Sequence, residues 1–425
     1  MDSIVVSGGR RLTGEVRVEG AKNSALKLIA AAMLAPGTSL LHNVPEISDV
    51  ATMREVVEGL GARTERKGHT VSVDAQRLDR FEAPYELVAR MRASIAVLGP
   101  LVARLGEAQV AMPGGCNIGS RKIDMHIRGL QELGVKITLG HGFIHAKAPD
   151  DGLIGAHVML DFPSVGATEN LLMAAVRARG TTVIENAARE PEIRDLVAFL
   201  SAMGARIGSE GSTLEIEGVE ELHPAEHTVV GDRIEAGTFL VAGAMTGGPV
   251  VVRGFCPADL EMVLMKLEQS GSEVACLEDG VRVQRENPIA PTDIQTLPHP
   301  GFPTDMQAQF MALLSLAEGS SVITENVFEN RFMFADELSR MGADIRIEHH
   351  HALVQGVRQL SGAPVISPDL RGGAALVLAG LVAEGTTIVR DSYHIDRGYE
   401  RFVEKLASIG ADVRRVEEPE PGDSV

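Results

Sequence analysis

Apolar and polar positions follow two patterns along the chain. Stretches such as SALKLIAAAML (24–34) and AALVLAGLV (374–382) are apolar on nearly every side, which predicts helices buried in a core. DVATMREVVEGL (49–60) places its apolar residues three or four positions apart, which predicts an amphipathic helix with one exposed face. Short β-branched runs between the helical stretches predict strands. The pattern therefore predicts an α/β chain with two kinds of helix.

This pattern occurs six times. A glycine closes each amphipathic helix, and successive copies lie 67 to 73 residues apart, at Gly61, Gly134, Gly204, Gly271, Gly342 and Gly410. A second glycine ends each apolar helix, which predicts a left-handed helix cap, at Gly37, Gly106, Gly180, Gly248, Gly319 and Gly385. Each unit reads helix, strand, helix, strand, hairpin, strand. Six such units divide naturally into three plus three.

The two ends of the chain indicate how the units are grouped. The sixth unit stops after GADVRRVEE, while the N-terminal IVVSGGRRLTGEVRV (4–18) resembles ALVQGVRQLSGAPVI (352–366). We expect the N-terminus to complete the last domain. Residues 22–229 would then form one domain and residues 1–21 with 230–416 the other, joined by a double crossover that acts as a hinge beside a cleft. The acidic end, residues 417–425, is predicted to be disordered.

Composition narrows the class of protein. The 425 residues carry a formal charge of −18, which argues against general binding to nucleic acid or to anionic membranes. Tryptophan is absent, which argues against a stacking surface for single-stranded nucleic acid. The N-terminus has no signal-peptide pattern, and no apolar run reaches the roughly 18 residues of a membrane span. We therefore expect a cytoplasmic protein, and we further expect a monomer that needs no cofactor and no metal.

Basic residues recur at matching places in this acidic chain. Lysine or arginine stands near the start of an apolar helix at Lys22, Arg92 and Arg371. Arginine follows the strand of its unit at Arg189, Arg331 and Arg397. Cationic side chains beside helix N-termini make a strong anion site, because both supply donors and positive potential. Each arginine could instead cap or pair within its own unit, but the matching placement favours a shared anionic ligand.

Three cysteines, Cys116, Cys256 and Cys276, lie far apart, which disfavours a disulfide framework or a zinc site. From the residues alone, Cys116 could be a buried small residue, half of a disulfide, a metal ligand or a reactive thiol. Its loop, PGGCNIGSRKID (113–124), is poor core sequence, and the nearby Arg121 and Lys122 favour a thiolate. We therefore predict a reactive Cys116. Cys256 and Cys276 are predicted to be structural, and EHHH (348–351) is predicted to be a solvated hairpin turn rather than a metal site.

Ten motifs, in order along the chain, carry a resemblance to a known family. They are GAKNSAL, MRASI, GPLVAR, PGGCNIGSRKIDMHI, PSVGATEN, ENAAREPEI, DRIEAGTFL, PTDMQAQF, FENRFM and HIDRGYER. The chain resembles the UDP-N-acetylglucosamine 1-carboxyvinyltransferases of the enolpyruvyl transferase family over essentially its whole length. The resemblance implies two inside-out α/β domains, each of three βαβαββ repeats. It also implies transfer of enolpyruvyl from phosphoenolpyruvate to the 3-hydroxyl of UDP-N-acetylglucosamine, with release of phosphate, the first committed step of peptidoglycan synthesis.

The resemblance assigns roles to individual residues. The phosphate of phosphoenolpyruvate would be bound by Lys22, Arg121 and Arg397, and its carboxylate by Arg331 and Arg371, with Asn23 assisting. Cys116 would protonate the vinyl CH₂ and form a covalent phospholactoyl adduct. Asp305 would take the proton of the sugar hydroxyl, although by itself it would be interpreted as a helix N-cap. Asp369 is a second carboxylate candidate near the reacting centre.

Contacts to the UDP-sugar are implied in the same way. They fall on Arg92, Arg121, Lys122, Ile123, Asp124, Met125, Ser164, Val165, Gly166, Asp305 and Val327. The chain departs from the family at Lys122, where proline is frequent, and near Ala96, where some members have a bulky aromatic residue. Because Cys116 is present rather than the aspartate of some members, alkylation by the epoxide antibiotic fosfomycin is expected.

Two other functions remain open at this stage. The sister enolpyruvyl transferase that acts on shikimate 3-phosphate shares the repeat and the cationic positions, but the Cys116 loop favours the UDP-sugar enzyme. A catalytically idle paralogue that binds a UDP-sugar is a different class of protein. The intact set of Lys22, Cys116, Asp305 and Arg397 argues against it.

Overall fold

The computed structural model of the chain describes residues 2–112 and 123–417, and it divides into two compact units. Unit 1 holds the described residues 2–19 and 231–417, and unit 2 holds the described residues 20–112 and 123–230. The chain therefore passes from one unit to the other at Glu19–Gly20 and returns at Val230–Gly231. Each unit has its own apolar core.

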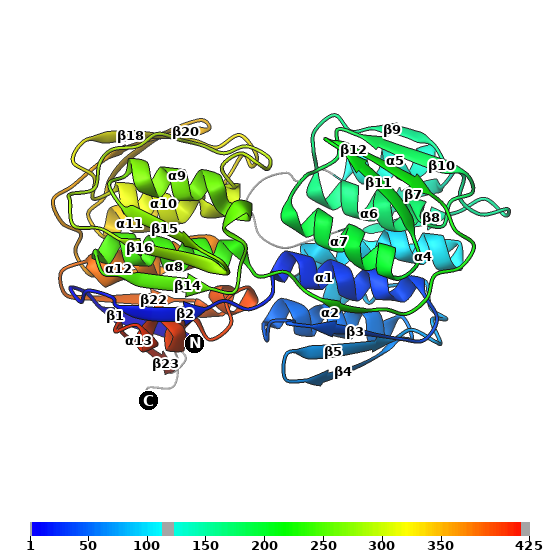
Figure 1. Ribbon diagram of the computed structural model, residues 1–425, viewed down its shortest axis with the longest axis horizontal. Helices are drawn as coiled ribbons and strands as arrows, with labels where there is room; N and C mark the ends of the chain where they lie inside the picture. Colours follow the sequence, from blue (N-terminus) through cyan, green and yellow to red (C-terminus); the bar gives the residue numbers. More distant parts are fainter. Residues whose placement is uncertain (1, 113–122, 418–425) are drawn as a thin grey trace. The chain divides into compact units, whose positions relative to one another are not determined.

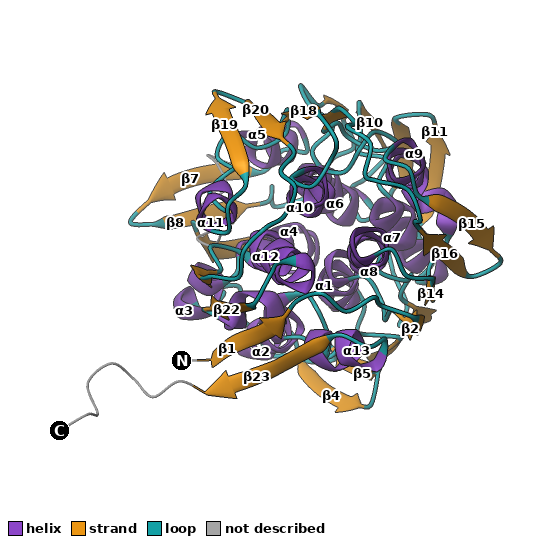
Figure 2. Cartoon of the chain, turned by 90° about the vertical axis from the view of Figure 1, so that its left-hand side faces the viewer, coloured by secondary structure: helices purple, strands orange, loops and turns teal. Residues whose placement is uncertain are grey.

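The apolar helices form the interior of each unit. In unit 1 they are α8 (Arg233–Thr246), α10 (Gln307–Leu314) and α12 (Leu370–Val382). In unit 2 they are α1 (Lys22–Ala31), α4 (Leu98–Leu105) and α6 (Val165–Ala175). Figure 2 shows α8, α10 and α12 inside unit 1 with strands around them. Nearly every residue of α8 and α12 is buried, because a helix without a polar face must be covered on all sides.

The amphipathic helices bury one face only. They are α2 (Ser48–Gly59), α5 (Asp124–Glu132), α7 (Pro191–Ala202), α9 (Glu261–Gln269), α11 (Ala335–Arg340) and α13 (Phe402–Ser408). In α2, Val56 and Val57 are buried while Glu55 and Glu58 are exposed, as the sequence predicts. The remaining helical segments are short: α3 (Tyr85–Arg90), η1 (Ala32–Leu34), η2 (Arg92–Val97), η3 (Pro257–Leu260), η4 (Thr304–Met306) and η5 (Ser392–Arg397).

Among the described residues of unit 2, the strands form three sheets, in the orders β13-β3-β5-β4, β6-β8-β7 and β11-β12-β10-β9. Their bounds are β3 (Thr38–His42), β4 (Arg63–Lys67), β5 (Thr70–Asp74), β6 (Glu107–Ala111), β7 (Lys136–Gly140), β8 (Phe143–Lys147), β9 (His157–Met159), β10 (Thr181–Glu185), β11 (Arg206–Glu210), β12 (Thr213–Glu217) and β13 (Glu226–Thr228). One parallel pair and two antiparallel pairs make up each four-stranded sheet, as in β9, β10, β12 and β11. In the second repeat the parallel strand is reduced to one bridge, between Glu82 and Gln109.

The described part of unit 1 repeats this arrangement, in the orders β15-β16-β14-β2, β17-β18-β20-β19 and β21-β22-β1-β23. The bounds are β1 (Asp2–Ser7), β2 (Gly14–Arg17), β14 (Val250–Arg253), β15 (Glu273–Leu277), β16 (Gly280–Gln284), β17 (Ile294–Gln295), β18 (Ser320–Thr324), β19 (Asp344–Glu348), β20 (His351–Gln355), β21 (Pro364–Ile366), β22 (Thr386–Arg390) and β23 (Asp412–Glu417). Figure 1 shows the blue strands β1 and β2 among the green to red elements of this unit.

The N-terminus completes the sixth repeat, as the sequence predicts. Strand β1 pairs antiparallel with both β22 and β23, so that Ile4 lies opposite Val389 on one side and Arg415 on the other. Strand β2 pairs in parallel with β14 of the fourth repeat, and β13 pairs in parallel with β3 of the first. The two segments that connect the units run side by side, because Ala21 N donates to Val230 O at 2.7 Å.

All the repeat glycines except Gly248 have a positive φ. All six that close the amphipathic helices have φ between 90° and 107°. Gly61 follows the C-cap residue Leu60, and the next N–H bonds back to Val57 O at 3.1 Å, a helix ending that favours glycine. The second glycine set behaves differently from the prediction. Gly106 caps α4, but Gly247 rather than Gly248 caps α8, and Gly180 lies five residues beyond Ala175, the last residue of α6.

Two further predictions are decided by the fold. The EHHH segment forms the turn between β19 and β20, with His349 at φ 55°, as predicted. Cys256 and Cys276 are both exposed and free, so their prediction as structural core residues is wrong. Cys276 lies on β15, an edge strand, and the sheets are the outer layer of an inside-out domain, so a strand residue there faces solvent. None of the described helices has the length and apolar character that a membrane crossing requires.

Candidate active site

Asp305 lies between two buried arginines in unit 1. It belongs to η4, which leads directly into the buried helix α10. Its Oδ1 accepts a hydrogen bond from Arg331 Nη2 at 2.7 Å, and its Oδ2 accepts from Arg371 Nη2 at 3.1 Å and Nε at 3.2 Å. The N-cap of η4 is Pro303, so the capping alternative for Asp305 is wrong. Charge-assisted hydrogen bonds to both oxygens fix the orientation of this carboxylate.

Arg371 is the second residue of α12 and is 3% exposed. Its guanidinium lies 5.1 Å from the centre of the Tyr399 ring, in a cation–π contact. Burial lowers the pKa of Arg371, but Tyr399 and Asp305 raise it by more, so the net shift of the pKa is upward and the side chain stays cationic. Its Nη1 has no hydrogen-bond partner among the described residues. A buried guanidinium with an unused nitrogen is suited to receive an anion.

Arg331 follows β18 and is also buried. Its Nη1 donates to Thr304 Oγ1 at 2.9 Å, and its guanidinium lies 5.3 Å from the centre of the Phe328 ring. Arg331 thus holds both Asp305 and the residue before it. The resemblance gives Arg331 and Arg371 one role and Asp305 another, whereas the structure joins all three side chains in one cluster.

Asp369 stands at the start of α12, beside Arg371. Its Oδ1 accepts from the backbone N–H of Arg371 at 2.8 Å and of Gly372 at 3.0 Å, so this carboxylate is the N-cap of the helix. The capping places the buried Asp369 at the helix end that also presents Arg371. A role for Asp369 in the reaction stays a prediction.

Arg397 is the last residue of η5 and is half-buried. This segment packs against α12, the helix that carries Arg371. Burial lowers the pKa of His394 on the same turn, and the positive charge of Arg397 lowers it further. Of the predicted catalytic and phosphoenolpyruvate-binding residues, unit 1 therefore holds Asp305, Arg331, Arg371 and Arg397. It also holds Asp369, at the N-terminal end of α12.

Lys22 begins α1 in unit 2, followed by Asn23. Its Nζ lies 2.8 Å from Asp49 Oδ2, and both side chains are nearly buried. Asp49 belongs to the first turn of α2, and its pairing could not be predicted from the sequence, because DVATMREVVEGL has the pattern of an ordinary amphipathic helix with a polar face. The ion pair fixes the ammonium group at the start of α1.

The helices α5 and α6 bring together two predicted UDP-sugar segments. Ile123, Asp124 and Met125 form the start of α5, and Ser164, Val165 and Gly166 form the start of α6. Ser164 caps α6, because its Oγ accepts from Ala167 N at 3.3 Å. Helix N-termini present unpaired N–H groups and positive potential, which suit the phosphates of a sugar nucleotide.

His126 joins these two helices. Its Nδ1 lies 3.0 Å from Asn170 Nδ2 on α6, and Gly166 approaches so closely that a Cβ there would lie 3.2 Å from the ring. Burial, together with the positive charges of Lys27 and Arg92, lowers the pKa of His126 from 6.5 to about 4. Arg92, at the start of η2, also has a pKa lowered by burial. The place of His126 could not be predicted from the sequence, since a single histidine inside the RKIDMHI motif carries no signal of its own.

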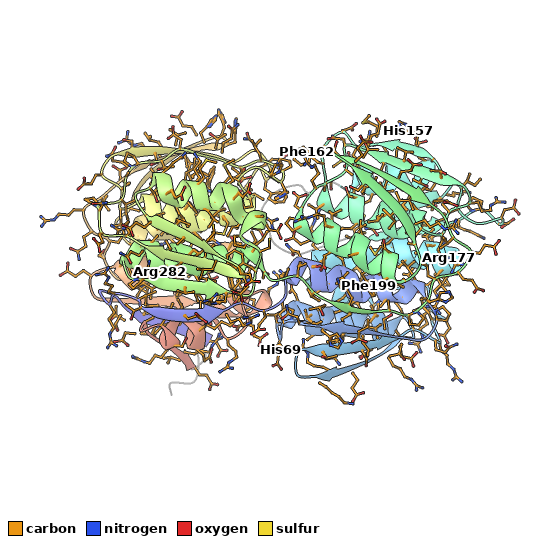
Figure 3. The ribbon with its side chains drawn as sticks, in the orientation of Figure 1. His69, His157, Phe162, Arg177, Phe199 and Arg282 are labelled. Atoms are coloured by element: carbon orange, nitrogen blue, oxygen red, sulfur yellow. The ribbon has the colours of Figure 1, made fainter. Side chains whose placement is uncertain are left out.

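A groove of about 250 Å³ adjoins the start of α5. Met125, Arg128, Gly129 and Glu132 line it from α5, and residues 157–160 line it from the side of β9. His157 lies on the outer face of unit 2, and Phe199 lies inside the unit against His227 (Figure 3).

Cys116, Arg121 and Lys122 fall outside the described residues, so their predicted roles stay predictions.

Comparison with known proteins decides the family. A profile of the family described as EPSP synthase (3-phosphoshikimate 1-carboxyvinyltransferase) matches residues 6–406. Curated proteins named UDP-N-acetylglucosamine 1-carboxyvinyltransferase from Desulfatibacillum aliphaticivorans and Gluconobacter oxydans are 52% and 54% identical to the chain, over 98% of this chain and 100% of each relative. One from Corynebacterium jeikeium is 55% identical over 98% of this chain and 99% of the relative. The chain belongs to the UDP-N-acetylglucosamine 1-carboxyvinyltransferase family.

Solved structures agree with this family at the level of the fold. The enolpyruvyl transferase NikO from Streptomyces tendae matches with a TM-score of 0.88 at 29% identity, over 98% of this chain and 99% of NikO. EPSP synthase from Acinetobacter baumannii matches with a TM-score of 0.78 at 18% identity, over 98% of this chain and 100% of that chain, which shows the fold alone. The predicted α/β class and the resemblance to UDP-N-acetylglucosamine 1-carboxyvinyltransferases are thereby confirmed.

Proposed function

We propose that the chain transfers the enolpyruvyl group of phosphoenolpyruvate to the 3-hydroxyl of UDP-N-acetylglucosamine and releases phosphate. This is the first committed step of peptidoglycan synthesis. The observation that carries the proposal is the cluster of Asp305 with the buried Arg331 and Arg371, in a chain about half identical to curated enzymes of this name over nearly its whole length. A carboxylate held rigidly beside two cations suits a reaction that moves a proton next to an anionic substrate.

The reaction needs an acid and a base. A proton is added to the vinyl CH₂ of phosphoenolpyruvate, and the sugar oxygen forms a bond to the neighbouring carbon while it loses its own proton. The bond from that carbon to the phosphate oxygen then breaks, and the new methyl group loses a proton to restore the double bond. We assign Cys116 as the acid and as the site of the covalent adduct, and Asp305 as the base that takes the hydroxyl proton.

Phosphoenolpyruvate carries a phosphate and a carboxylate, and we assign separate cations to each. Arg331 and Arg371 receive the carboxylate, for which the unused Nη1 of Arg371 offers a donor. Lys22, Arg121 and Arg397 receive the phosphate, with Asn23 assisting. Lys22 and Arg397 are classed as catalytic because they stabilise the charge that develops on the leaving phosphate. Asp369 is assigned a supporting place at the start of α12.

UDP-N-acetylglucosamine is assigned to the starts of α5 and α6. The residues are Arg92, Arg121, Lys122, Ile123, Asp124, Met125, Ser164, Val165, Gly166, Asp305 and Val327. The two helix N-termini supply N–H donors to the diphosphate. We assign residues 22–229 and residues 1–21 with 230–416 as the two catalytic domains, and we place the protein in the cytoplasm as a monomer.

Phosphate release from phosphoenolpyruvate tests the proposal. The acceptor is either UDP-N-acetylglucosamine or shikimate 3-phosphate, and the wild-type chain is compared with Cys116→Ser. Release with the UDP-sugar alone, reduced in the variant, is expected. Release with shikimate 3-phosphate would move the chain to the sister reaction. Release with neither acceptor would favour an idle UDP-sugar-binding paralogue.

A further inference from the structure

A buried carboxylate outside the predicted set touches the Asp305 cluster. Glu325 directly follows β18 and is 3% exposed. Its Oε2 accepts a hydrogen bond from Thr304 Oγ1 at 2.8 Å, and its Oε1 accepts from Thr296 Oγ1 at 2.9 Å. Because Thr304 precedes Asp305 in η4, Glu325 holds the residue that sets the position of the proposed base.

The same carboxylate also holds the loop that contains Val327. Oε1 of Glu325 accepts from the backbone N–H of Val327 at 2.8 Å and of Phe328 at 3.1 Å. Thr296 strengthens this attachment, because its Oγ1 accepts from Asn326 N at 2.9 Å. Four donors therefore converge on the two oxygens of one side chain.

The hydroxyl of Thr304 gives this network a direction. A threonine hydroxyl has one hydrogen to donate. Since Thr304 donates it to Glu325, the oxygen presents its lone pairs to Arg331 Nη1, which donates to it at 2.9 Å. The other nitrogen of Arg331 binds Asp305 Oδ1 at 2.7 Å. Three consecutive hydrogen bonds thus link Glu325 to Asp305 through Thr304 and Arg331.

We propose that Glu325 is a positioning residue that couples the orientation of Asp305 to the conformation of the loop 326–328. The inference rests on the proposed function, because Asp305 and Val327 act on the UDP-sugar only there. Glu325 itself touches no substrate in this scheme. It fixes the position of the base Asp305 relative to that of the sugar-nucleotide contact Val327, so that a movement of one is transmitted to the other.

Glu325→Gln is the most informative single change. It keeps the volume of the side chain but replaces one acceptor oxygen by an NH₂ group, which is a donor. If the new NH₂ group faces Thr296, Val327 and Phe328, it meets three donors. If it faces Thr304, the hydroxyl hydrogen of Thr304 loses its acceptor while Arg331 still donates to the same oxygen. Either orientation leaves a buried donor without an acceptor, which is costly in a protein interior.

Steady-state kinetics with UDP-N-acetylglucosamine provide the first readout. We expect Glu325→Gln to lower kcat/KM for the UDP-sugar by about 10- to 100-fold, by analogy with the loss of hydrogen-bond partners that orient metal ligands. Glu318→Gln is the matched control, because Glu318 is an exposed carboxylate just before the other end of β18. Its kcat and KM should equal those of the wild type.

Thr304 separates positioning from a general loss of packing. Thr304→Val keeps the shape and removes the hydroxyl, so its kcat should fall, whereas Thr304→Ser should recover most of the loss. The double variant Glu325→Gln with Thr304→Val should be no slower than the slower single variant, since both changes break one chain of contacts. Losses that multiply, or a Thr304→Val enzyme with wild-type kcat, would overturn the proposal.

Hydrogen exchange gives a readout that does not depend on turnover. In Glu325→Gln, the amides of Val327 and Phe328 should exchange about tenfold faster or more, because a hydrogen bond to a charged acceptor is lost. Glu318→Gln should leave them unchanged. If the wild-type chain transfers nothing to the UDP-sugar, the proposed function fails while faster exchange still supports the coupling. Unchanged exchange would overturn the coupling even in a fully active enzyme.

Discussion

At the scale of single residues, the structure separates side chains that the sequence alone could not. Asp305 and Asp369 both read as aspartates at the start of a helix. One is clamped by Arg331 and Arg371, while the other accepts two backbone N–H groups as an N-cap. The difference arises from side chains that are distant in sequence, such as Arg331, and no local pattern contains it. The presence of the chemically important residues was predictable, but their pairing was not.

Asp369 allows its capping role to be separated from a role in the reaction. Asp369→Ala should lower the free energy of unfolding by about 1 kcal/mol, because α12 loses its N-cap. Asp369→Asn keeps a capping oxygen and should restore most of that stability. If Asp369 also serves the reaction, the stable Asp369→Asn variant should still turn over slowly. Chemical denaturation and phosphate release together measure both effects, and full activity in Asp369→Asn would reduce the residue to a cap.

Cys116 is expected to be the thiol that fosfomycin alkylates. Intact-protein mass spectrometry should show the gain of one fosfomycin mass, which is absent in Cys116→Ser. Cys256 and Cys276 serve as internal controls, since both are exposed and free yet lie outside the predicted loop. Modification of either control in place of Cys116 would contradict the expectation and would show that exposure alone governs reactivity.

At the scale of helices and strands, buried charges tie the inner helices together. Lys27 of α1 forms an ion pair with Glu169 of α6, whose side chain is 1% exposed. Burial raises the pKa of Glu169, and Lys27 opposes that shift. The apolar pattern of α1 correctly predicts that the helix is buried, but Lys27 within it gives no indication of its partner. Such pairs form only when two distant repeats pack, so they are not visible to helical periodicity.

Replacing Lys27 by an uncharged residue should lower the free energy of unfolding strongly. Lys27→Met leaves Glu169 buried without its cation, and we expect the free energy of unfolding to fall by about 3–5 kcal/mol. The double variant Lys27→Met with Glu169→Met should regain most of this loss, since the uncompensated charge is gone. Arg10→Met breaks the exposed pair with Asp412 and should cost less than about 1 kcal/mol. Urea denaturation of the four proteins checks the order, and equal losses for Lys27→Met and Arg10→Met would contradict it.

His126, between α5 and α6, predicts a dependence of stability on pH. Its pKa is lowered from 6.5 to about 4, by burial and by Lys27 and Arg92, with Asp124 opposing. Well above pH 6.5 the ring is neutral in the folded and the unfolded chain. As the pH falls from 6.5 to about 4, the unfolded chain binds a proton that the folded chain refuses. Stability attributable to His126 is therefore lost over this window, by up to about 3 kcal/mol.

The His126 prediction has two measurements. Denaturation between pH 7 and 4 should show a smaller loss of stability in His126→Gln than in the wild type. The imidazole signals of His126 in an NMR titration should remain those of the neutral ring down to about pH 5. A midpoint near the ordinary histidine value would show that the ring is not shielded as the structure indicates.

At the scale of the whole molecule, most of the fold could be predicted from the sixfold repeat in the sequence. Glycine spacing and helix pattern led to two sets of three units, and the match between the two ends of the chain led to the N-terminal strand in the last sheet. The reduced parallel strand near Glu82 was not predictable, because one bridge pair leaves no strand pattern in the sequence. The exposed Cys276 is a second example. The sequence predicts that its strand exists, but it does not show on which face of the sheet each residue lies.

Strand β1 should matter to unit 1 rather than to unit 2. Val6 is fully buried, whereas Val5 on the opposite face of the strand is only half-buried. Val6→Asp should destabilise unit 1 strongly, while Val5→Asp should cause at most a modest loss. Hydrogen exchange resolved by peptide should show the loss in β22 and β23 and leave β3 and β10 of unit 2 unchanged. Equal effects in both units would contradict the assignment of the strand.

Strand β1 is synthesised long before the two strands that pair with it. Residues 2–7 pair with residues 386–390 and 412–417. At about 5–20 residues per second, the intervening stretch of about 400 residues takes roughly 20–80 s to synthesise. Unit 2, with its strands between residues 38 and 228, is made within that interval. The nascent chain therefore carries the residues of β1 without either partner strand for most of this interval, which leaves them open to pairing with other chains.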